Sequence, residues 1–136
     1  MPSTAAAHAM PRAALWIGRA MSGIVILFLA MDITMKLANL AVVGEAGLQL
    51  GWAPQTARTL GVILLACTAL YAWPRTAVLG AILLTGYFGG AVAAHPRVDD
   101  PLFTHILFGV YLGVFAWGGL WLRDPDVRAL LPWRRA

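Results

Sequence analysis

The stretch from Thr76 to Ala94, nineteen residues without a charge, constrains this chain more than any other feature. A helix that crosses the hydrocarbon core of a bilayer needs about 20 such residues. The composition agrees, because 60% of the 136 residues are hydrophobic and only 12% are charged. A soluble domain of this length has a large surface for its volume and needs more charge to cover it. The sequence therefore predicts a chain that is solvated by lipid.

Four apolar segments are predicted to span the membrane as helices, at about residues 13–38, 57–73, 76–95 and 102–122. In the first segment the uncharged core, Ala20 to Met31, is only twelve residues long. It spans only if Arg19 and Lys36 extend their charged ends toward the two interfaces. A cleavable signal peptide is the alternative, but Asp32 and Lys36 continue the helical spacing and no clear cleavage site follows. The predicted fold is therefore all-α, a transmembrane four-helix bundle that residues 1–136 form as a single domain.

Basic residues distinguish the two sides of the predicted bundle. The side with the termini and the turn between the second and third helices has seven of them: Arg12, Arg19, Arg75, Arg123, Arg128, Arg134 and Arg135. The other side has Lys36, Arg58 and Arg97. The positive-inside rule then predicts cytoplasmic termini, a basic cytoplasmic tail at residues 123–136 and a multi-pass protein of the cell inner membrane or plasma membrane. An aromatic belt on the cytoplasmic side is predicted from Trp16, Trp73, Trp121 and Trp133.

The ionisable groups outside these basic anchors gather on the non-cytoplasmic side. Asp32 and Lys36 end the first helix, His95 ends the third, and His105 begins the fourth. Charges at the margin of hydrocarbon are costly unless they are paired or hydrated, so we expect these groups to meet in one polar site. We call this site the polar cup, and its candidate ligand-binding residues are Asp32, Lys36, Glu45, Tyr87, His95, Arg97 and His105.

The members of the polar cup also have structural interpretations. Asp32 and Lys36 are spaced i, i+4 and can form an ion pair that marks where the helix leaves the membrane. His95 can stabilise the negative end of a helix dipole. The two histidines hold a metal ion only with a third ligand from a neighbouring carboxylate, and no metal site is predicted. Asp99 and Asp100 are predicted to be solvated in the loop.

Glycines and hydroxyl-bearing residues within the predicted spans are expected to serve the structure of the helices. Gly86-x-x-x-Gly90 and Gly109-x-x-x-Gly113 place glycines one turn apart, which favours close helix packing within the chain over dimerisation. The deeper hydroxyls are expected to bond to helix carbonyls, although they could also orient a quinone headgroup. They belong to Ser22, Thr85, Tyr87 and Tyr111.

Two further classes of chemistry are not predicted. Cys67 is the only cysteine, so the chain forms no internal disulfide and has no C-x-x-C motif. The pI is near 10, but no basic stripe is interleaved with aromatic residues that stack on bases. Nucleic acid is therefore not a predicted partner, and the basic residues are assigned to lipid headgroups.

Three stretches of the chain have a familiar order and spacing. They are Arg19-Ala-Met-Ser-Gly23 followed by Asp32-x-x-x-Lys36-Leu37, then RTAVLGAILLTGYFGGAVAAHPR (75–97) and FTHILFGVYLGVFAWGGLWLRD (103–124). Together they resemble the DoxX-like family over about residues 12–132. The resemblance implies a membrane bundle of four helices, and most members have no assigned activity. The family is named after a component linked to thiosulfate:quinone oxidation, and its recurrent positions correspond here to Asp32, Lys36, Tyr87, His95 and His105.

Three functions are compatible with these observations. The first is an accessory or small-lipophile-binding subunit, whose partners are the lipid bilayer, a small lipophilic ligand and either a redox-complex protein or a second copy in a homodimer. The second is an oxidoreductase component or an enzyme acting on a quinone-like or sterol-like substrate, with His95, His105 and Asp32 as acid–base groups. The third is a small transporter, which the position of Asp32 near a helix end disfavours. No motif identifies a cofactor, and a quinone is the only class that the resemblance suggests.

Overall fold

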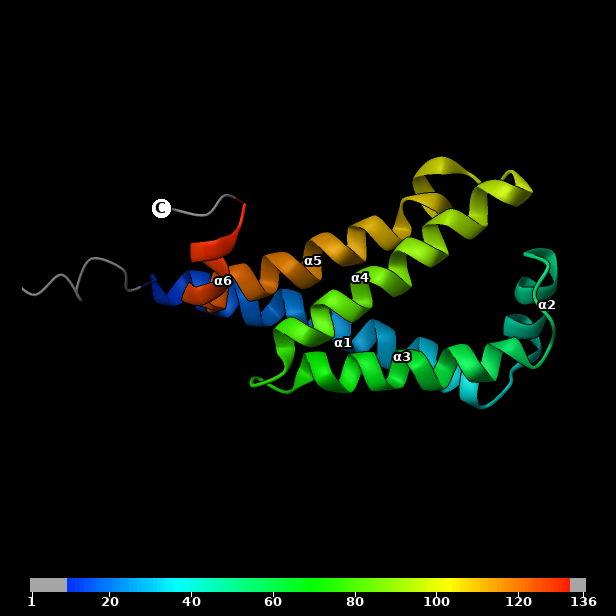
Figure 1. Ribbon diagram of the computed structural model, residues 1–136, viewed down its shortest axis with the longest axis horizontal. Helices are drawn as coiled ribbons and strands as arrows, with labels where there is room; N and C mark the ends of the chain where they lie inside the picture. Colours follow the sequence, from blue (N-terminus) through cyan, green and yellow to red (C-terminus); the bar gives the residue numbers. More distant parts are fainter. Residues whose placement is uncertain (1–9, 133–136) are drawn as a thin grey trace, which may run out of the picture.

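The computed structural model describes residues 10–132, and every regular element in that range is helical (Figure 1). The α-helices are α1 (Arg12–Leu37), α2 (Ala41–Gln49), α3 (Thr56–Ala72), α4 (Ala77–Ala94), α5 (Phe108–Arg123) and α6 (Pro125–Leu130). Two short helical turns, η2 (His95–Val98) and η3 (Leu102–Ile106), lie between α4 and α5. The prediction of an all-α fold is confirmed for the described residues. α2, a helix of nine residues, lies between α1 and α3.

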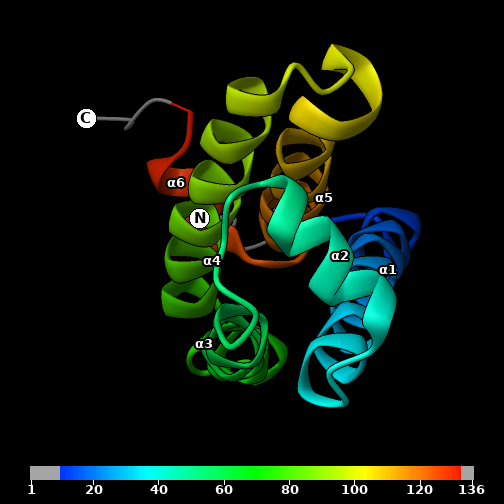
Figure 2. The ribbon, with the colours of Figure 1, turned by 90° about the vertical axis from the view of Figure 1, so that its right-hand side faces the viewer.

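The four long helices pack side by side along one direction. α1 contacts α3 and α5, and α4 contacts the same two helices, so each long helix has two neighbours. α2 lies across one end of this arrangement, and the connection between α4 and α5 reaches the same end (Figures 1 and 2). α6 and the start of α1 lie at the opposite end. We call these the α2 end and the α6 end.

Three helical stretches of the described chain are long and apolar enough to cross a membrane. They are Arg12–Leu37, Ala77–Val98 and Leu102–Arg123. The second and third include η2 and η3, because the chain stays helical on both sides of the proline-containing loop. α3 is shorter, with 17 residues, and it rises about 25 Å against a hydrocarbon core about 30 Å thick.

Large apolar side chains cover the outside of these helices. Leu27 is 74% exposed, Phe103 is 71% exposed and Trp16 is 66% exposed. Soluble monomers rarely expose such side chains in contiguous patches. The exposed apolar surface and the helix lengths together indicate a membrane protein.

A hydrogen-bonded tyrosine at the centre of the core joins three helices. Tyr71 of α3 is fully buried and donates its hydroxyl proton to the backbone carbonyl of Ala116 in α5 at 2.7 Å. The Tyr71 oxygen therefore accepts from the Ser22 hydroxyl of α1 at 2.8 Å. A buried polar group is costly unless it is bonded, and this chain of bonds satisfies both hydroxyls. Ser22 thus bonds to a tyrosine rather than to a helix carbonyl as expected.

Thr85 does follow the expected pattern. Its hydroxyl donates to the carbonyl of Ala81 one turn earlier at 2.7 Å. The same oxygen accepts a bond from the indole nitrogen of Trp117 on α5 at 2.8 Å. A hydroxyl that satisfies its own helix therefore also links α4 to α5.

The turn between α3 and α4 brings the two helices into backbone contact. Thr76 fastens the turn by donating its hydroxyl to the carbonyl of Leu70 at 2.8 Å. A Cβ atom at Gly80 would lie only 2.2 Å from the backbone nitrogen of Tyr71. Only glycine fits here, because backbone atoms cannot move aside as the end of a side chain can.

We predict that Gly80→Ala destabilises the protein by about 1–3 kcal/mol, the usual cost of forcing a methyl group into filled space. The measurement is thermal unfolding of the detergent-purified protein, followed by circular dichroism. Gly89→Ala is the matched control, because a Cβ atom at Gly89 meets nothing within 4 Å. Equal midpoints for the two variants would contradict the backbone contact.

Candidate functional site

An ion pair lies at the inner side of the predicted polar cup. The Lys36 ammonium contacts both carboxylate oxygens of Asp32 one turn earlier on α1, as the i, i+4 spacing predicts. The Lys36 side chain is 16% exposed and that of Asp32 is 28% exposed. Because each charge neutralises the other, this part of the site is close to neutral although it contains two ions.

A second polar group, built around His95, lies where α4 ends. Its Nδ1 atom is 2.5 Å from a carboxylate oxygen of Asp100. The chain returns toward His95 because Asp99 adopts a left-handed conformation, with φ of 56°. Asp99 is exposed as expected, but the prediction that Asp100 is simply solvated is wrong, because its side chain is held by the histidine.

His105 lies beside His95, and the two histidines bond to different side chains. The two rings meet edge to face with centroids 5.9 Å apart. Nδ1 of His105 bonds to the hydroxyl of Thr104 at 2.8 Å. Among residues 10–132, no three histidine, cysteine or acidic side chains lie close enough to hold a metal ion.

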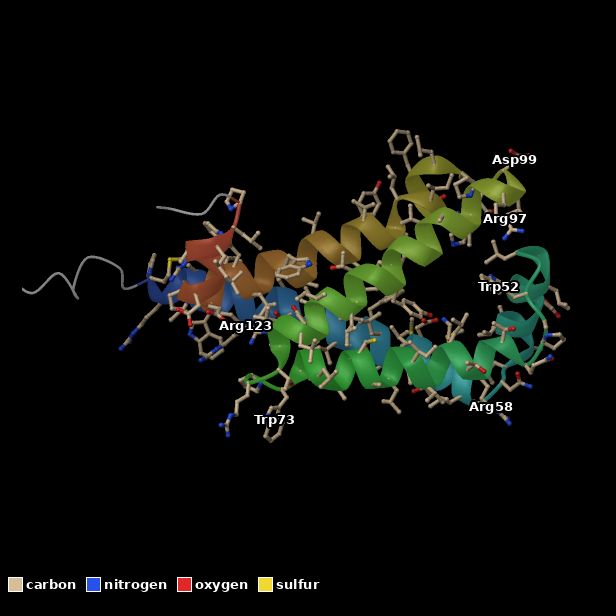
Figure 3. All side chains as sticks on the ribbon, in the orientation of Figure 1. Trp52, Arg58, Trp73, Arg97, Asp99 and Arg123 are labelled. Atoms are coloured by element: carbon tan, nitrogen blue, oxygen red, sulfur yellow. The ribbon has the colours of Figure 1, made fainter. Side chains whose placement is uncertain are left out.

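The remaining candidates of the polar cup lie in different surroundings. Tyr87 is half-buried on α4, and it lines the same pocket as Lys36, the partner of Asp32. Glu45 on α2 and Arg97 on η2 are exposed, and the described residues offer neither of them an ion pair. The structure therefore brings Asp32, Lys36 and Tyr87 together as one group and His95 and His105 as another. Figure 3 shows Arg97 beside Asp99 at the α2 end.

A pocket of about 380 Å³ connects these two groups. Its walls come from α2, from the connection that follows α2, from the first turns of α3 and from the last turns of α4. Most of the lining is apolar, and the polar side chains that contribute are Lys36, Tyr87 and His95. This combination of an apolar wall and a few polar groups is typical of small-molecule sites.

Small residues on α4 create the pocket. Gly86, Gly90 and Ala94 lie one turn apart on the face that lines it. A Cβ atom at Gly86 or Gly90 would meet nothing within 4 Å. The prediction that this glycine pair packs against another helix is therefore wrong, because its missing side chains leave open space instead.

The other glycine pair does serve packing at its first member. A Cβ atom at Gly109 would lie 3.1 Å from the Phe88 carbonyl oxygen and 3.0 Å from a methyl group of Val92. This close approach of α5 to α4 follows the small-residue rule for membrane helices. A Cβ atom at Gly113 has only one neighbour, the Phe88 ring at 3.9 Å, so that position is less constrained.

α2 forms the outer wall of the pocket and is held loosely. It has no buried residue, although Val43, Gly47 and other residues on it line the pocket. Residues with positive φ stand on both sides of it, Asn39 at 54° and Gly51 at 79°. α2 is thus a separate short helix between two sharp changes of chain direction (Figure 2).

Sequence reasoning missed several pocket residues. Trp52 and Pro54 line the pocket from the connection after α2, which has no helical period to indicate which side chains point inward. Asp100 was missed because its bond to His95 depends on the left-handed turn at Asp99. The only hint of this bond in the sequence was that Asp100 follows His95 by five positions, with Pro96 between them.

The helices and the pocket define an all-helical membrane protein with a largely apolar pocket at one end. The chain belongs to the DoxX-like family, whose model matches residues 20–119. This confirms the resemblance described above. Searches of curated proteins and of solved structures give no match to this chain.

We predict that Asp32→Asn lowers the free energy of unfolding by about 1.5–3 kcal/mol, the usual worth of a hydrogen bond to a charged group. The substitution leaves the mostly buried Lys36 ammonium without its counter-ion. The measurement is unfolding of the purified protein in mixed micelles with increasing denaturing detergent.

The exposed Glu45→Gln is the control and should leave stability unchanged. The double variant Asp32→Asn/Lys36→Met should recover part of the loss, because it removes the uncompensated charge. A double variant less stable than Asp32→Asn would contradict this account.

Proposed function

We propose that this DoxX-like protein is an accessory membrane subunit that binds a small lipophilic molecule in the pocket at the α2 end. The observation that carries the proposal is the pocket itself, with its apolar walls and with Lys36, Tyr87 and His95 among the residues that line it. Its volume of about 380 Å³ falls in the range of small-molecule sites. The bilayer supplies such a ligand, because a lipophilic molecule concentrates there.

We further propose a transmembrane four-helix bundle with both termini in the cytoplasm. The α6 end holds the start of α1 and α6, and Arg123 lies there, whereas Arg58, Arg97 and Asp99 lie at the α2 end (Figures 1 and 3). The excess of arginine at the α6 end supports its assignment to the cytoplasm of a multi-pass inner-membrane or plasma-membrane protein. α3 serves as the fourth span, and residues 123–136 are the cytoplasmic tail. Arg134, Arg135 and Trp133, which belong to this prediction, lie outside the described residues.

The arrangement of the helices can be tested with single cysteines in a Cys67→Ala background. We predict that Arg97→Cys reacts with a membrane-impermeant maleimide on intact cells, because Arg97 is exposed at the non-cytoplasmic end. Arg75→Cys, in the turn after α3, should react only after the cells are permeabilised. Labelling of both positions from the same side would overturn the proposed topology.

The bound molecule is expected to be uncharged. The only ammonium group in the pocket wall is already paired with Asp32, and His95 has a carboxylate partner in Asp100. An additional charge in the ligand would have no free counter-ion and would lose its hydration. Quinone-like and sterol-like molecules satisfy this condition, and a quinone remains the proposed cofactor class. A redox-complex protein or a second copy of the chain remains the proposed partner.

The pair formed by His95 and Asp100 favours a second candidate, an oxidoreductase component or enzyme that acts on the same kind of ligand. A carboxylate that holds one nitrogen of a histidine fixes the ring and leaves the other nitrogen available for proton transfer. A small transporter is less well supported, because both oxygens of Asp32 are engaged by Lys36 and the pair lies close to the end of α1.

The pocket can be filled without disturbing helix packing. We predict that Gly90→Leu removes the co-purifying lipophilic molecule, because Gly90 lines the pocket and a Cβ atom there meets nothing within 4 Å. The measurement is mass spectrometry of organic extracts from protein purified in mild detergent. The extracted amount, normalised to protein, should fall by more than tenfold.

Gly89→Leu is the matched control on the same helix. Gly89 also faces open space, but it does not line the pocket, so this variant should retain the ligand. Equal recovery of the molecule from both variants, or its absence from the wild-type protein, would refute binding in this pocket.

A further inference from the structure

Two polar groups that line the pocket lie about two turns apart along α4 and its continuation into η2. They are Tyr87 in α4 and His95, the first residue of η2, eight positions later in the chain. At 1.5 Å per residue, their backbone positions are about 12 Å apart along the helix. Between them the same face presents Gly90, Ala91 and Ala94. The pocket therefore offers a deeper polar group, Tyr87, and one nearer the α2 end, His95, with small apolar residues between them. We call these two positions its inner and outer ends.

We infer that the pocket selects a rigid, flat, uncharged ring system with one oxygen function at each end. A carbonyl oxygen accepts a hydrogen bond from Tyr87, and a hydroxyl group bonds to His95. A multi-ring steroid skeleton that carries a ketone at one end and a hydroxyl at the other has this form. The inference rests on the proposed function, since it specifies the ligand of the same pocket.

The inner end requires a hydrogen-bond acceptor. Within the described chain, the Tyr87 hydroxyl has no hydrogen-bond partner, and both oxygens of the carboxylate of Asp32 are engaged by Lys36. A half-buried phenol in an apolar wall gains about 0.5–1.5 kcal/mol when its proton finds an acceptor. A ligand carbonyl supplies that acceptor without bringing a charge into the site.

The outer end suits a hydroxyl group. Asp100 occupies the Nδ1 atom of His95, so the ring can offer only its Nε2 atom to a ligand. That nitrogen accepts a hydrogen bond when the ring is neutral and donates one when the ring is protonated. A hydroxyl group satisfies either state, because it is both a donor and an acceptor.

The floor between the two ends favours flat rings over flexible chains. Glycine and alanine leave no side chain that reaches between ligand atoms, so a planar face can lie directly on the helix backbone. Trp52, Pro54 and Leu60 add larger apolar side chains to the lining. A rigid ligand also loses less conformational entropy on binding than a flexible chain of the same size.

The test uses three tritiated steroids and the full-length protein in lipid nanodiscs. The probes are testosterone, which carries a ketone and a hydroxyl at opposite ends, and two analogues that each lack one of these groups. Tyr87→Phe removes the proposed donor at the inner end. His95→Asn keeps a polar group near Asp100 but lacks the Nε2 atom.

We expect Tyr87→Phe to weaken testosterone binding about three- to tenfold and to leave the affinity of the ketone-free analogue unchanged. His95→Asn should weaken testosterone binding by a similar factor and leave the analogue without the hydroxyl unchanged. Tyr111→Phe is the matched control, because Tyr111 does not line the pocket, and this variant should bind like the wild-type protein. The inference would be overturned if neither Tyr87→Phe nor His95→Asn changed the affinity for testosterone. It would also be overturned if both variants lost the contact to the same oxygen of the steroid.

Gly90→Leu separates the failure of this inference from that of the proposed function. In one outcome, Gly90→Leu binds none of the three steroids, but Tyr87→Phe and His95→Asn do not each respond to a different oxygen of the steroid. This outcome would support the pocket and refute a ligand with one oxygen function at each end. In another outcome, the wild-type protein binds no steroid but retains a different lipophilic molecule, which Gly90→Leu loses. This outcome would refute the steroid as ligand and leave the proposed function of the pocket standing. Steroid binding that Gly90→Leu leaves unchanged would refute the pocket itself.

Discussion

The structure depends on the exclusion of charge from a surface that hydrocarbon solvates. Leucine, phenylalanine and tryptophan side chains cover the outside of the helices, and lipid is the solvent that tolerates them. Polar groups in the interior must then satisfy one another, as the bonds from Ser22 to Tyr71 and from Tyr71 to Ala116 do. Ionisable groups gather at the two ends, and the ends differ in kind. The α6 end carries the excess of arginine, whereas the α2 end carries the two pairs Lys36–Asp32 and His95–Asp100 beside exposed charges such as Glu45 and Arg97.

The pairing at the α2 end explains how an apolar pocket can lie among so many ionisable residues. Lys36 is neutralised by Asp32, and His95 is held by Asp100, so the wall of the pocket presents little net charge. The volume comes from missing side chains, since Gly86 and Gly90 leave space that no neighbouring helix fills. Charge compensation thus accounts for the low net charge of the pocket wall, and the missing side chains account for its volume. The proposed binding of a neutral lipophilic molecule needs both.

Some of these features could be predicted from the sequence, and others could not. Helix position follows from the length of apolar runs, and the ion pair of α1 follows from its i, i+4 spacing, because both are local properties. The glycine-lined wall of the pocket was not predicted, because a glycine pair one turn apart looks the same whether it meets a helix, as Gly109 does, or faces open space, as Gly90 does. The bond between His95 and Asp100 escaped prediction because it requires a left-handed residue that is not glycine. The residues of the polar cup were chosen only by the side of the membrane on which they were predicted to lie. That criterion could not distinguish the exposed Glu45 from the mostly buried Lys36.

The loose attachment of α2 has an energetic consequence for the whole site. A helix of nine residues is too short to be stable by itself in water, and this one buries none of its residues against the neighbouring helices. Its local opening therefore costs far less free energy than global unfolding does, and amide hydrogen exchange should be fastest there among the helices that line the pocket. A molecule that fills the pocket adds contacts to α2 and slows this exchange, so occupancy and the order of the outer wall are thermodynamically linked. Entry of the proposed ligand through this wall would require only the opening of a single short helix, and the packing of the four long helices would stay intact.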